Sequence, residues 1–240
     1  MSAILEMKNV SRIYRNGRGL QTMDLTLGKG EILGLLGANG SGKTTLLKIA
    51  SGLMRPDAGS ISIAGADPYA NPARALRRVG AIIETPALYL HLSCEENLKI
   101  ACMYHQISAK KNAERMMELF SLTDFRREAV KKFSLGMKQR LAVAIQFLGN
   151  KKLLLLDEPT NGLDIENAVI VKNAIRQACH ETGAAAIISS HLSADLERIA
   201  TRVRILKDGR TVKDTPIENA LSEKQTLEDF YMSAVKEESA

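Results

Sequence analysis

The chain has 240 residues, of which 45% are hydrophobic, 25% are charged and 4% are aromatic, and its formal net charge is +6. This length and composition are typical of a soluble α/β protein with one substantial core, or with a core and a smaller lobe. Trp is absent, no run of five or six basic residues occurs, and no apolar run approaches the ~18 residues of a membrane span, so nucleic-acid stacking and spanning segments are both disfavoured.

The N-terminal part predicts short antiparallel strands. Residues 3–27 contain strand-like segments separated by a turn at 16–19, and a second turn follows at 28–30. Tyr14 lies in the first of these segments, where its simplest role is ordinary packing.

A phosphate-binding loop follows the next strand. Residues 31–36 are the apolar run of a strand buried on both faces, and residues 37–44 (G-A-N-G-S-G-K-T) fill the pattern G-x-x-x-x-G-K-[ST]. The helix that opens at Thr45 directs its N-terminus at the same place, so this is no mere glycine-rich turn. Lys43 would reach the terminal phosphates and the Thr44 hydroxyl would bind magnesium. The predicted nucleotide-binding residues in this stretch are Gly37, Asn39, Gly40, Ser41, Gly42, Lys43, Thr44 and Thr45.

The middle of the chain changes from strand to helix. Residues 60–64 and 77–83 read as strands, the second ending at Glu84. Helical periodicity then appears at 95–100 and 112–120. The sequence therefore predicts a helical lobe that interrupts a sheet-based core.

The last helix of this lobe begins at a capping residue. Ser134 is a good N-cap, an apolar stripe follows, and Gly149 is a natural terminator. By pattern alone this is a core helix, and its N-terminus is a candidate second anion site.

Two adjacent carboxylates follow another buried strand. Residues 153–156 are four leucines, and Asp157 and Glu158 come at their end, where phosphate-loop proteins place catalytic groups. Asp157 would hold Mg²⁺, directly or through water, and Glu158 would take a proton from the water that attacks the γ-phosphate. The alternative, a pair of solvated capping acids, is much weaker after a phosphate loop.

The C-terminal third predicts a helix to about residue 182, a strand over 185–190 and a hairpin over 203–212. His191 comes directly after the strand, and there it is about as suited to meet the γ-phosphate as to a structural role. Residues 216–240 read as an amphipathic helix with an acidic, frayed tail, to which we assign no chemistry.

Taken in order, these motifs resemble the ATP-binding subunit of an ABC transporter over roughly residues 4–215. The resemblance implies an α/β fold: a P-loop NTPase (RecA-like) core with an inserted helical subdomain and a small N-terminal antiparallel β region. The expected divisions are 1–84 and 150–215 for the core, 85–149 for the helical subdomain, and 216–240 for a C-terminal helix and tail.

The resemblance also implies a homodimer that encloses ATP and Mg²⁺. In that family the phosphate loop of one copy and the signature helix of the other enclose each ATP. The signature L-S-G-G-Q reads F-S-L-G-M here, at residues 133–137, and keeps the serine and the second glycine. By likeness, Ser134 and Gly136 would touch the partner's γ-phosphate, Asp164 would bridge the two copies, and Tyr14 would stack on adenine.

A second departure concerns the junction of core and lobe, where the family usually has Gln and this chain has Glu84. By likeness, Glu84 would contact the nucleotide or the metal. We expect that the metal compensates the added charge or that the pKa of Glu84 rises. Glu84 together with S-L-G-M-K-Q looks like the branch that exports lantibiotics or bacitracin-like peptides.

The leading hypothesis is an ATPase that drives export of such a peptide, or of a drug, through a separate permease. The catalytic residues would be Lys43, Glu158 and His191. Unpaired cysteines and an N-terminus without a signal peptide's apolar centre suit the cytoplasmic face of the membrane.

Two other functions fit these motifs less well. A soluble ABC-type ATPase acting on nucleic acid or ribosomes usually carries coiled-coil insertions or a second ATPase unit, for which this chain has no room, so no nucleic-acid partner is expected. A regulatory module that holds ATP without hydrolysing it would not need Glu158 and His191.

Overall fold

A three-stranded antiparallel sheet is built from the N-terminal part of the chain in the computed structural model, which describes residues 3–84 and 87–238. Its strand order is β2-β1-β4. Apolar residues alternate with polar ones along β1 and β2, so Leu5, Met7 and Leu25 are buried on one face. The strands are β1 (Leu5–Ile13), β2 (Gly19–Leu27) and β4 (Ala58–Ile63).

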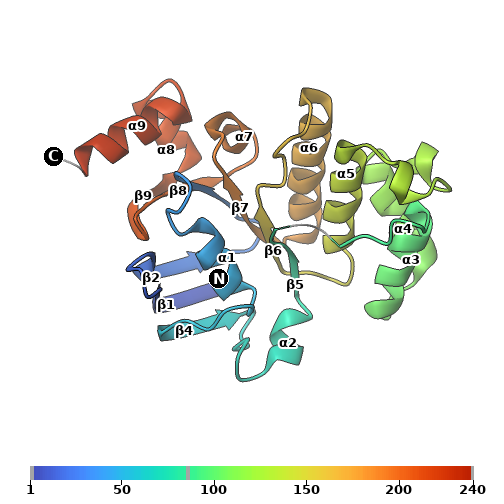
Figure 1. The fold of residues 1–240 in the computed structure, drawn as a ribbon, viewed down its shortest axis with the longest axis horizontal. Coiled ribbons are helices and arrows are strands. Elements are labelled where there is room, and N and C mark those ends of the chain that lie inside the picture. Colours follow the sequence, from blue (N-terminus) through green and yellow to red (C-terminus); the bar gives the residue numbers. More distant parts are fainter. Residues whose placement is uncertain (1–2, 85–86, 239–240) are drawn as a thin grey trace.

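A six-stranded sheet with the order β5-β6-β7-β3-β8-β9 forms the centre of the molecule (Figure 1). All neighbouring strands pair in parallel except β9, which forms a hairpin with β8. The carboxyl ends of β3, β6 and β7 therefore meet at one edge, the place where α/β sheets bind ligands. The strands are β3 (Ile32–Leu36), β5 (Val79–Ile82), β6 (Leu153–Asp157), β7 (Ala185–Ser190), β8 (Arg202–Lys207) and β9 (Arg210–Pro216).

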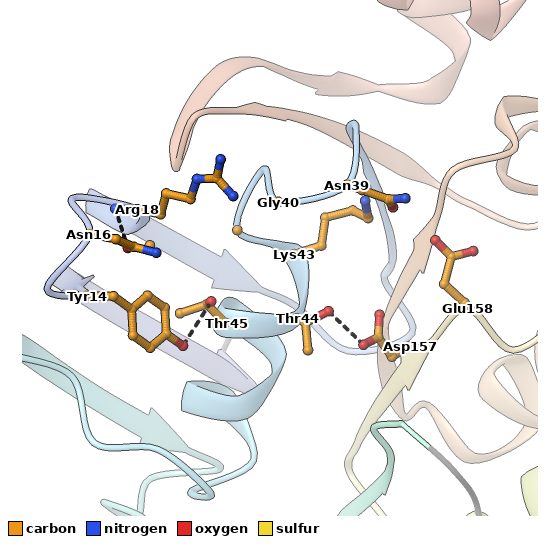
Figure 2. A pocket seen from close by; sticks show the side chains of 12 residues that line it. Tyr14, Asn16, Arg18, Asn39, Gly40, Lys43, Thr44, Thr45, Asp157 and Glu158 are labelled. Carbon is orange, nitrogen blue, oxygen red and sulfur yellow. Dashed lines mark hydrogen bonds between the residues drawn. The ribbon is translucent and has the colours of Figure 1, made fainter.

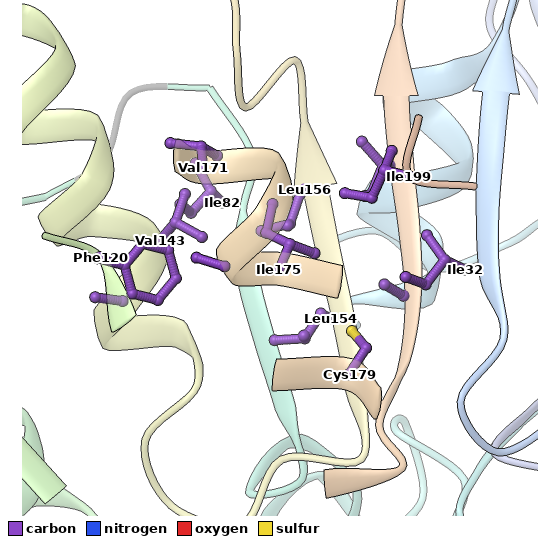
Figure 3. Packing of buried hydrophobic residues seen from close by; sticks show 14 of the residues in the cluster. Ile32, Ile82, Phe120, Val143, Leu154, Leu156, Val171, Ile175, Cys179 and Ile199 are labelled. Atoms are coloured by element: carbon purple, nitrogen blue, oxygen red, sulfur yellow. The ribbon is translucent and has the colours of Figure 1, made fainter. Parts of the chain in front are cut away.

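Helices α3, α4 and α5 form the predicted lobe beside β5 (Figure 1). One hydrophobic cluster joins the lobe to the core: Phe120 lies by Val143 of α5, and Val171 and Ile175 of α6 lie between α5 and Leu156 of the sheet (Figure 3). Among the described residues, no helix is both long and apolar enough to cross a bilayer. The helices up to β8 are α1 (Lys43–Ala50), α2 (Pro72–Leu76), α3 (Cys94–Tyr104), α4 (Ala109–Leu119), α5 (Leu135–Gln146), α6 (Ile165–Thr182) and α7 (Ser193–Glu197).

The observed elements confirm the predicted fold class, with small differences. The lobe boundary expected at residue 85 lies outside the described residues. Helix α5 ends at Gln146, before Gly149, which instead turns the chain toward β6 with φ of 87°. The short helices α2 and α7 were not predicted.

The prediction for the C-terminus was right about a helix and wrong about a frayed tail. In place of one helix and a frayed tail, the chain forms α8 (Ile217–Glu223) and α9 (Leu227–Glu237). Thr226 caps α9 by accepting from the Asp229 N–H at 3.1 Å. Leu227, Phe230 and Ala234 recur at helical spacing and are buried, and α9 contacts α7, α8, β8 and β9. The acidic composition of the segment suggested fraying, but its apolar period decided the structure.

Candidate functional site

Most of the nucleotide-binding residues predicted around the phosphate loop meet in a pocket at the carboxyl edge of the central sheet (Figure 2). Three segments form it: the turn after β1, the loop from β3 into α1, and the end of β6. The lining residues are Tyr14, Asn16, Arg18, Gly19, Asn39, Gly40, Gly42, Lys43, Thr44, Thr45, Asp157 and Glu158.

The loop between β3 and α1 has a shape that its glycines permit. Gly40 and Gly42 have φ of 82° and 105°, a region that other residues rarely occupy. A Cβ at Gly37 would lie 2.4 Å from the Leu206 carbonyl oxygen. The Ser41 hydroxyl is buried and has no hydrogen-bond partner in the described part of the chain. Such a group is costly unless it is paired, and a phosphate oxygen would pair it, so the loop fits a phosphorylated ligand.

Lys43 is held inside this loop. Its side chain is buried, and Nζ donates to the carbonyl oxygens of Gly37 at 2.6 Å and Ala38 at 3.2 Å. Burial lowers the pKa of Lys43, and the charges of Glu158 and Asp157 oppose that shift. An ammonium has a third donor, so Lys43 keeps one N–H for a ligand in the pocket.

Asp157 is fixed by hydroxyl groups on both sides. One carboxylate oxygen accepts from Thr44 Oγ1 at 2.9 Å (Figure 2), and the other accepts from the Ser189 hydroxyl. Ser189, at the end of β7, also accepts from the Glu158 N–H at 2.9 Å, a role that sequence reasoning missed. The described residues contain no cluster of three or more His, Cys, Asp or Glu that could hold a metal alone. The two oxygens of Thr44 and Asp157 fit Mg²⁺, which usually takes few protein ligands and completes its shell with phosphate and water.

Glu158 pairs with the predicted histidine. Glu158 Oε2 lies 2.8 Å from His191 Nδ1. This contact joins the ends of β6 and β7. Glu158 has φ of 49°, a strained conformation of the kind that clusters at functional sites. Its carboxylate is held by the imidazole and still borders the pocket, so it can accept a proton from a water molecule there.

The opposite end of the pocket is formed by the turn after β1. The Tyr14 hydroxyl lies 3.4 Å from Thr45 Oγ1, and Asn16 Oδ1 accepts from the Arg18 N–H at 3.1 Å. Sequence reasoning treated 16–19 only as a turn and missed Asn16 and Arg18 as lining residues. The available signal was a cation, Arg18, in a turn four residues beyond Tyr14.

Ser134, Gly136 and Asp164 do not line the pocket of their own chain. Ser134 caps α5 and Asp164 caps α6, accepting from the N–H groups of Met137 and Asn167 at 3.2 and 2.8 Å. Asn167 also donates its side-chain amide to both Asp164 oxygens, and a Cβ at Gly136 would lie 2.4 Å from Asn167 Cγ. The starts of α5 and α6 thus pack closely at Asn167, a contact that the sequence did not reveal.

Glu84 also lies outside the pocket lining and is paired within the chain. Lys48 of α1 donates to Glu84 Oε1 at 2.7 Å, and this contact lowers the pKa of Glu84. Of the two expected alternatives, a raised pKa does not hold, because a cation on the phosphate-loop helix compensates the added charge, and compensation by the metal stays a prediction. Contact of Glu84 with nucleotide or metal stays a prediction.

The C-terminal helix borders the site as well. Tyr231 of α9 lines one hollow with Ala38 of the phosphate loop and another with His191. A segment without assigned chemistry therefore flanks the phosphate loop and His191.

Comparison with known proteins agrees with this geometry. The family model for the ABC transporter matches residues 20–161. The chain is 33% identical to the bacitracin transport ATP-binding protein BcrA of Bacillus licheniformis, over 97% of this chain and 76% of BcrA. It is 32% identical to the lantibiotic transport ATP-binding protein SrtF of Streptococcus pyogenes, over 97% of each chain. A solved ATP-binding subunit of an ABC transporter superposes with a TM-score of 0.85 at 30% identity, over 97% of this chain and 99% of that one.

Proposed function

The chain belongs to the ABC transporter family and is an ATPase of that family, and from this premise we propose that it hydrolyses Mg-ATP to drive peptide export through a separate permease. The observation that carries this proposal is the site itself, where Lys43, Thr44, Asp157 and Glu158 meet on one pocket. Full-length similarity to bacitracin and lantibiotic transport proteins supports a peptide of that class as the exported molecule.

Different residues of this chain bind the phosphates, hold the metal and accept the proton during ATP hydrolysis. Backbone N–H groups of residues 37–44, the Ser41 hydroxyl and Lys43 bind the phosphates. Thr44 and Asp157 would hold Mg²⁺, and the bound ion would neutralise part of the phosphate charge. Glu158 accepts the proton of the attacking water, and His191 orients the carboxylate that does so.

A second copy of the chain would complete the site. Ser134 and Asp164 sit at helix starts away from their own pocket, and each is followed by an exposed apolar residue, Leu135 at 60% and Ile165 at 86%. Exposed apolar side chains suit a surface that is covered in an assembly. The helix N-termini beside them suit contact with a phosphate. Head-to-tail pairing would bring this surface to the partner's phosphate loop.

The permease would meet the helical lobe. Large apolar side chains are exposed near both ends of α3, with Tyr89 and Leu90 before it and Met103 and Tyr104 at its end. Such residues are enriched in protein interfaces, and docking there would hold the chain peripherally at the cytoplasmic face of the membrane.

The function is tested by purifying the chain with its permease and placing the complex in lipid nanodiscs. We expect magnesium-dependent ATP hydrolysis that a bacitracin- or lantibiotic-class peptide stimulates and that the same mixture without magnesium lacks. Absence of hydrolysis both alone and beside the permease would refute the proposal. Retention of the chain on ribosomes or RNA, with no membrane partner, would point instead to the soluble class of ABC ATPase.

Replacing Glu84 by Gln should affect coupling more than ATP affinity. Gln keeps the size of the side chain but loses the ion pair with Lys48, so α1 and the junction are no longer tied by charge. The coupling free energy between two sites of a protein is typically about 1–3 kcal/mol, which changes affinity by about 5–150-fold. Because the Glu84–Lys48 pair is exposed, we expect the lower bound, which is a decrease of about fivefold in peptide-stimulated ATPase activity. Lys48→Gln breaks the same pair from the other side and should act in the same direction. Unchanged transport and unchanged stimulation in both variants would remove the coupling role.

A further inference from the structure

The contact between Glu158 and His191 depends on two loops that follow different strands. Glu158 begins the loop after β6, and His191 begins the loop after β7. Both side chains are partly exposed, so packing alone does not hold them together. The φ of 49° at Glu158 is strained as well, and a strained conformation persists only where the surrounding structure enforces it. Other residues must therefore fix the separation of the two loops.

At the ends of the strands, the loops are joined by Ser189, which is fully buried. The Glu158 N–H donates to the Ser189 carbonyl oxygen at 3.2 Å and to Ser189 Oγ at 2.9 Å. The same hydroxyl donates to Asp157, so Ser189 holds the backbone from which both carboxylates project. None of these contacts reaches past Glu158, and the loop that follows needs a second tie.

That second tie is made by Asp195, in the first turn of α7. Asp195 Oδ2 accepts from Thr160 Oγ1 at 2.6 Å, and Asp195 Oδ1 accepts from Lys172 Nζ at 2.5 Å. Thr160 comes two residues after Glu158. Asp195 comes four residues after His191, and Lys172 belongs to α6. We call Thr160, Lys172 and Asp195 the Asp195 cluster, which joins both loops to α6 at one carboxylate.

The chain between His191 and Asp195 has little freedom. Ser190 Oγ accepts from the Leu192 N–H at 3.0 Å and donates to the Leu192 carbonyl oxygen at 3.1 Å. The Asp195 N–H donates to the same carbonyl oxygen at 3.3 Å. On the side of β6, residues 158–161 form a turn that an N–H to carbonyl bond of 3.1 Å closes. A displacement of the Asp195 cluster is therefore passed on to the ends of the strands and is not absorbed between them.

A helix-capping role does not account for Asp195. An acid in the first turn of a helix is usually stabilised by the free N–H groups of that helix. In the described part of the chain, both oxygens of Asp195 accept instead from side chains of other segments. The Asp195 cluster is also largely buried, and Thr160 has a relative exposure of 8%. Water does not readily replace such bonds, so they hold a geometry better than an exposed ion pair does.

We propose that Asp195 is a positioning residue of the ATPase. Through Thr160 it sets the separation of the two loops, and so keeps Glu158 Oε2 at 2.8 Å from His191 Nδ1. Lys172 holds the Asp195 carboxylate from α6 and gives the cluster a fixed point. The inference rests on the proposed function, because it takes Glu158 as the base and His191 as the group that orients it.

The first experiment replaces the hydroxyl that joins the loops and measures ATP hydrolysis by the full chain with its permease. Thr160→Val removes this link and leaves the ion pair of Asp195 and Lys172 in place. Because a misplacement of about 1 Å can cost about 10²-fold, we expect kcat to fall by about 10–100-fold. The KM for ATP should be nearly unchanged, since the phosphate loop keeps its contacts.

Two matched variants control for the loss of a threonine. Thr160→Ser restores the hydroxyl without the methyl group and should recover most of the rate. Thr211→Val removes an exposed hydroxyl from β9 and should hydrolyse ATP as fast as the parent. Lys172→Met keeps the Thr160 hydroxyl but frees Asp195 from α6. It should lower kcat in the same direction, and it supplies the same test if Thr160→Val does not fold.

Two further measurements distinguish positioning from a purely structural role. In a double-mutant cycle, Thr160→Val should add little to the loss caused by Glu158→Gln, because it acts through the same carboxylate. The ring-nitrogen resonances of His191, assigned with His191→Gln, should move in Thr160→Val toward their position in Glu158→Ala, which lacks the contact.

The outcomes separate this inference from the proposed function. If Glu158→Gln is slow while Thr160→Val is as fast as the parent, the inference fails and the proposed function survives. Losses that multiply in the double variant, or His191 resonances that do not move, would leave the Asp195 cluster a purely structural role and overturn the inference as well. If Glu158→Gln itself is as fast as the parent, the assignment of the base in the proposed function fails.

Discussion

Glu158→Gln is expected to lower the rate of ATP hydrolysis by roughly 10²–10⁴-fold, the usual contribution of a general base. Gln preserves the shape of the side chain and can still hydrogen-bond His191, but an amide does not accept the proton of the attacking water. Lys43, Thr44 and Asp157 keep their contacts, so ATP binding should be nearly unchanged. Phosphate release in steady state gives the rate, and calorimetric titration with ATP gives the affinity.

Two controls separate this effect from a general loss of charge. Glu166→Gln changes an exposed acid in the first turn of α6 and should leave the rate unaltered. Asp157→Asn should raise the magnesium concentration needed for activity, because Asp157 is assigned to the metal. A Glu158→Gln enzyme as fast as its parent would remove Glu158 from the role of base.

The phosphate loop could be predicted because its chemistry leaves few choices of residue. Gly40 and Gly42 occupy conformations that other residues avoid, and Asp157 and Glu158 must follow a buried strand to reach the carboxyl edge of the sheet. These requirements are local, so they are visible along the chain. The same applies to Ser134 and Asp164, whose side chains cap the helices that they begin.

Contacts between distant elements carried no such local signal. Lys48 reaches Glu84 only because α1 presents it toward the end of β5, and Asn167 meets Gly136 only because α5 packs on α6. For the C-terminal segment a helix was predicted, but the acidic composition suggested a tail where the spacing of Leu227, Phe230 and Ala234 forms a further helix.

Asp214→Ala is expected to lower the free energy of unfolding by about 3–5 kcal/mol, the usual cost of removing one partner of a buried ion pair. Asp214 of β9 accepts from Arg202 at 2.5 and 2.6 Å and from Arg204 Nε at 2.7 Å. The two arginines also donate to the carbonyl oxygens of Thr26 and Asp24 in β2, so the network ties the central sheet to the N-terminal one. Without Asp214, the buried guanidinium of Arg204 would lose its carboxylate. Urea unfolding at neutral pH measures the difference.

The same difference should depend on pH in a defined direction. Burial alone would raise the pKa of Asp214, but the hydrogen bonds and charges of Arg202 and Arg204 outweigh it, so the pKa in the folded protein is lowered. A lowered pKa contributes stability that is fully present above the unfolded value of about 3.9 and is lost as the pH falls through the folded value. The gap between parent and Asp214→Ala should therefore be constant near neutrality and shrink only below about pH 4. Glu218→Ala removes an exposed acid in the first turn of α8 and should have the stability of the parent both near neutrality and at acid pH. Equal stabilities of Asp214→Ala and the parent at pH 7 would show that the network does not hold the two sheets together.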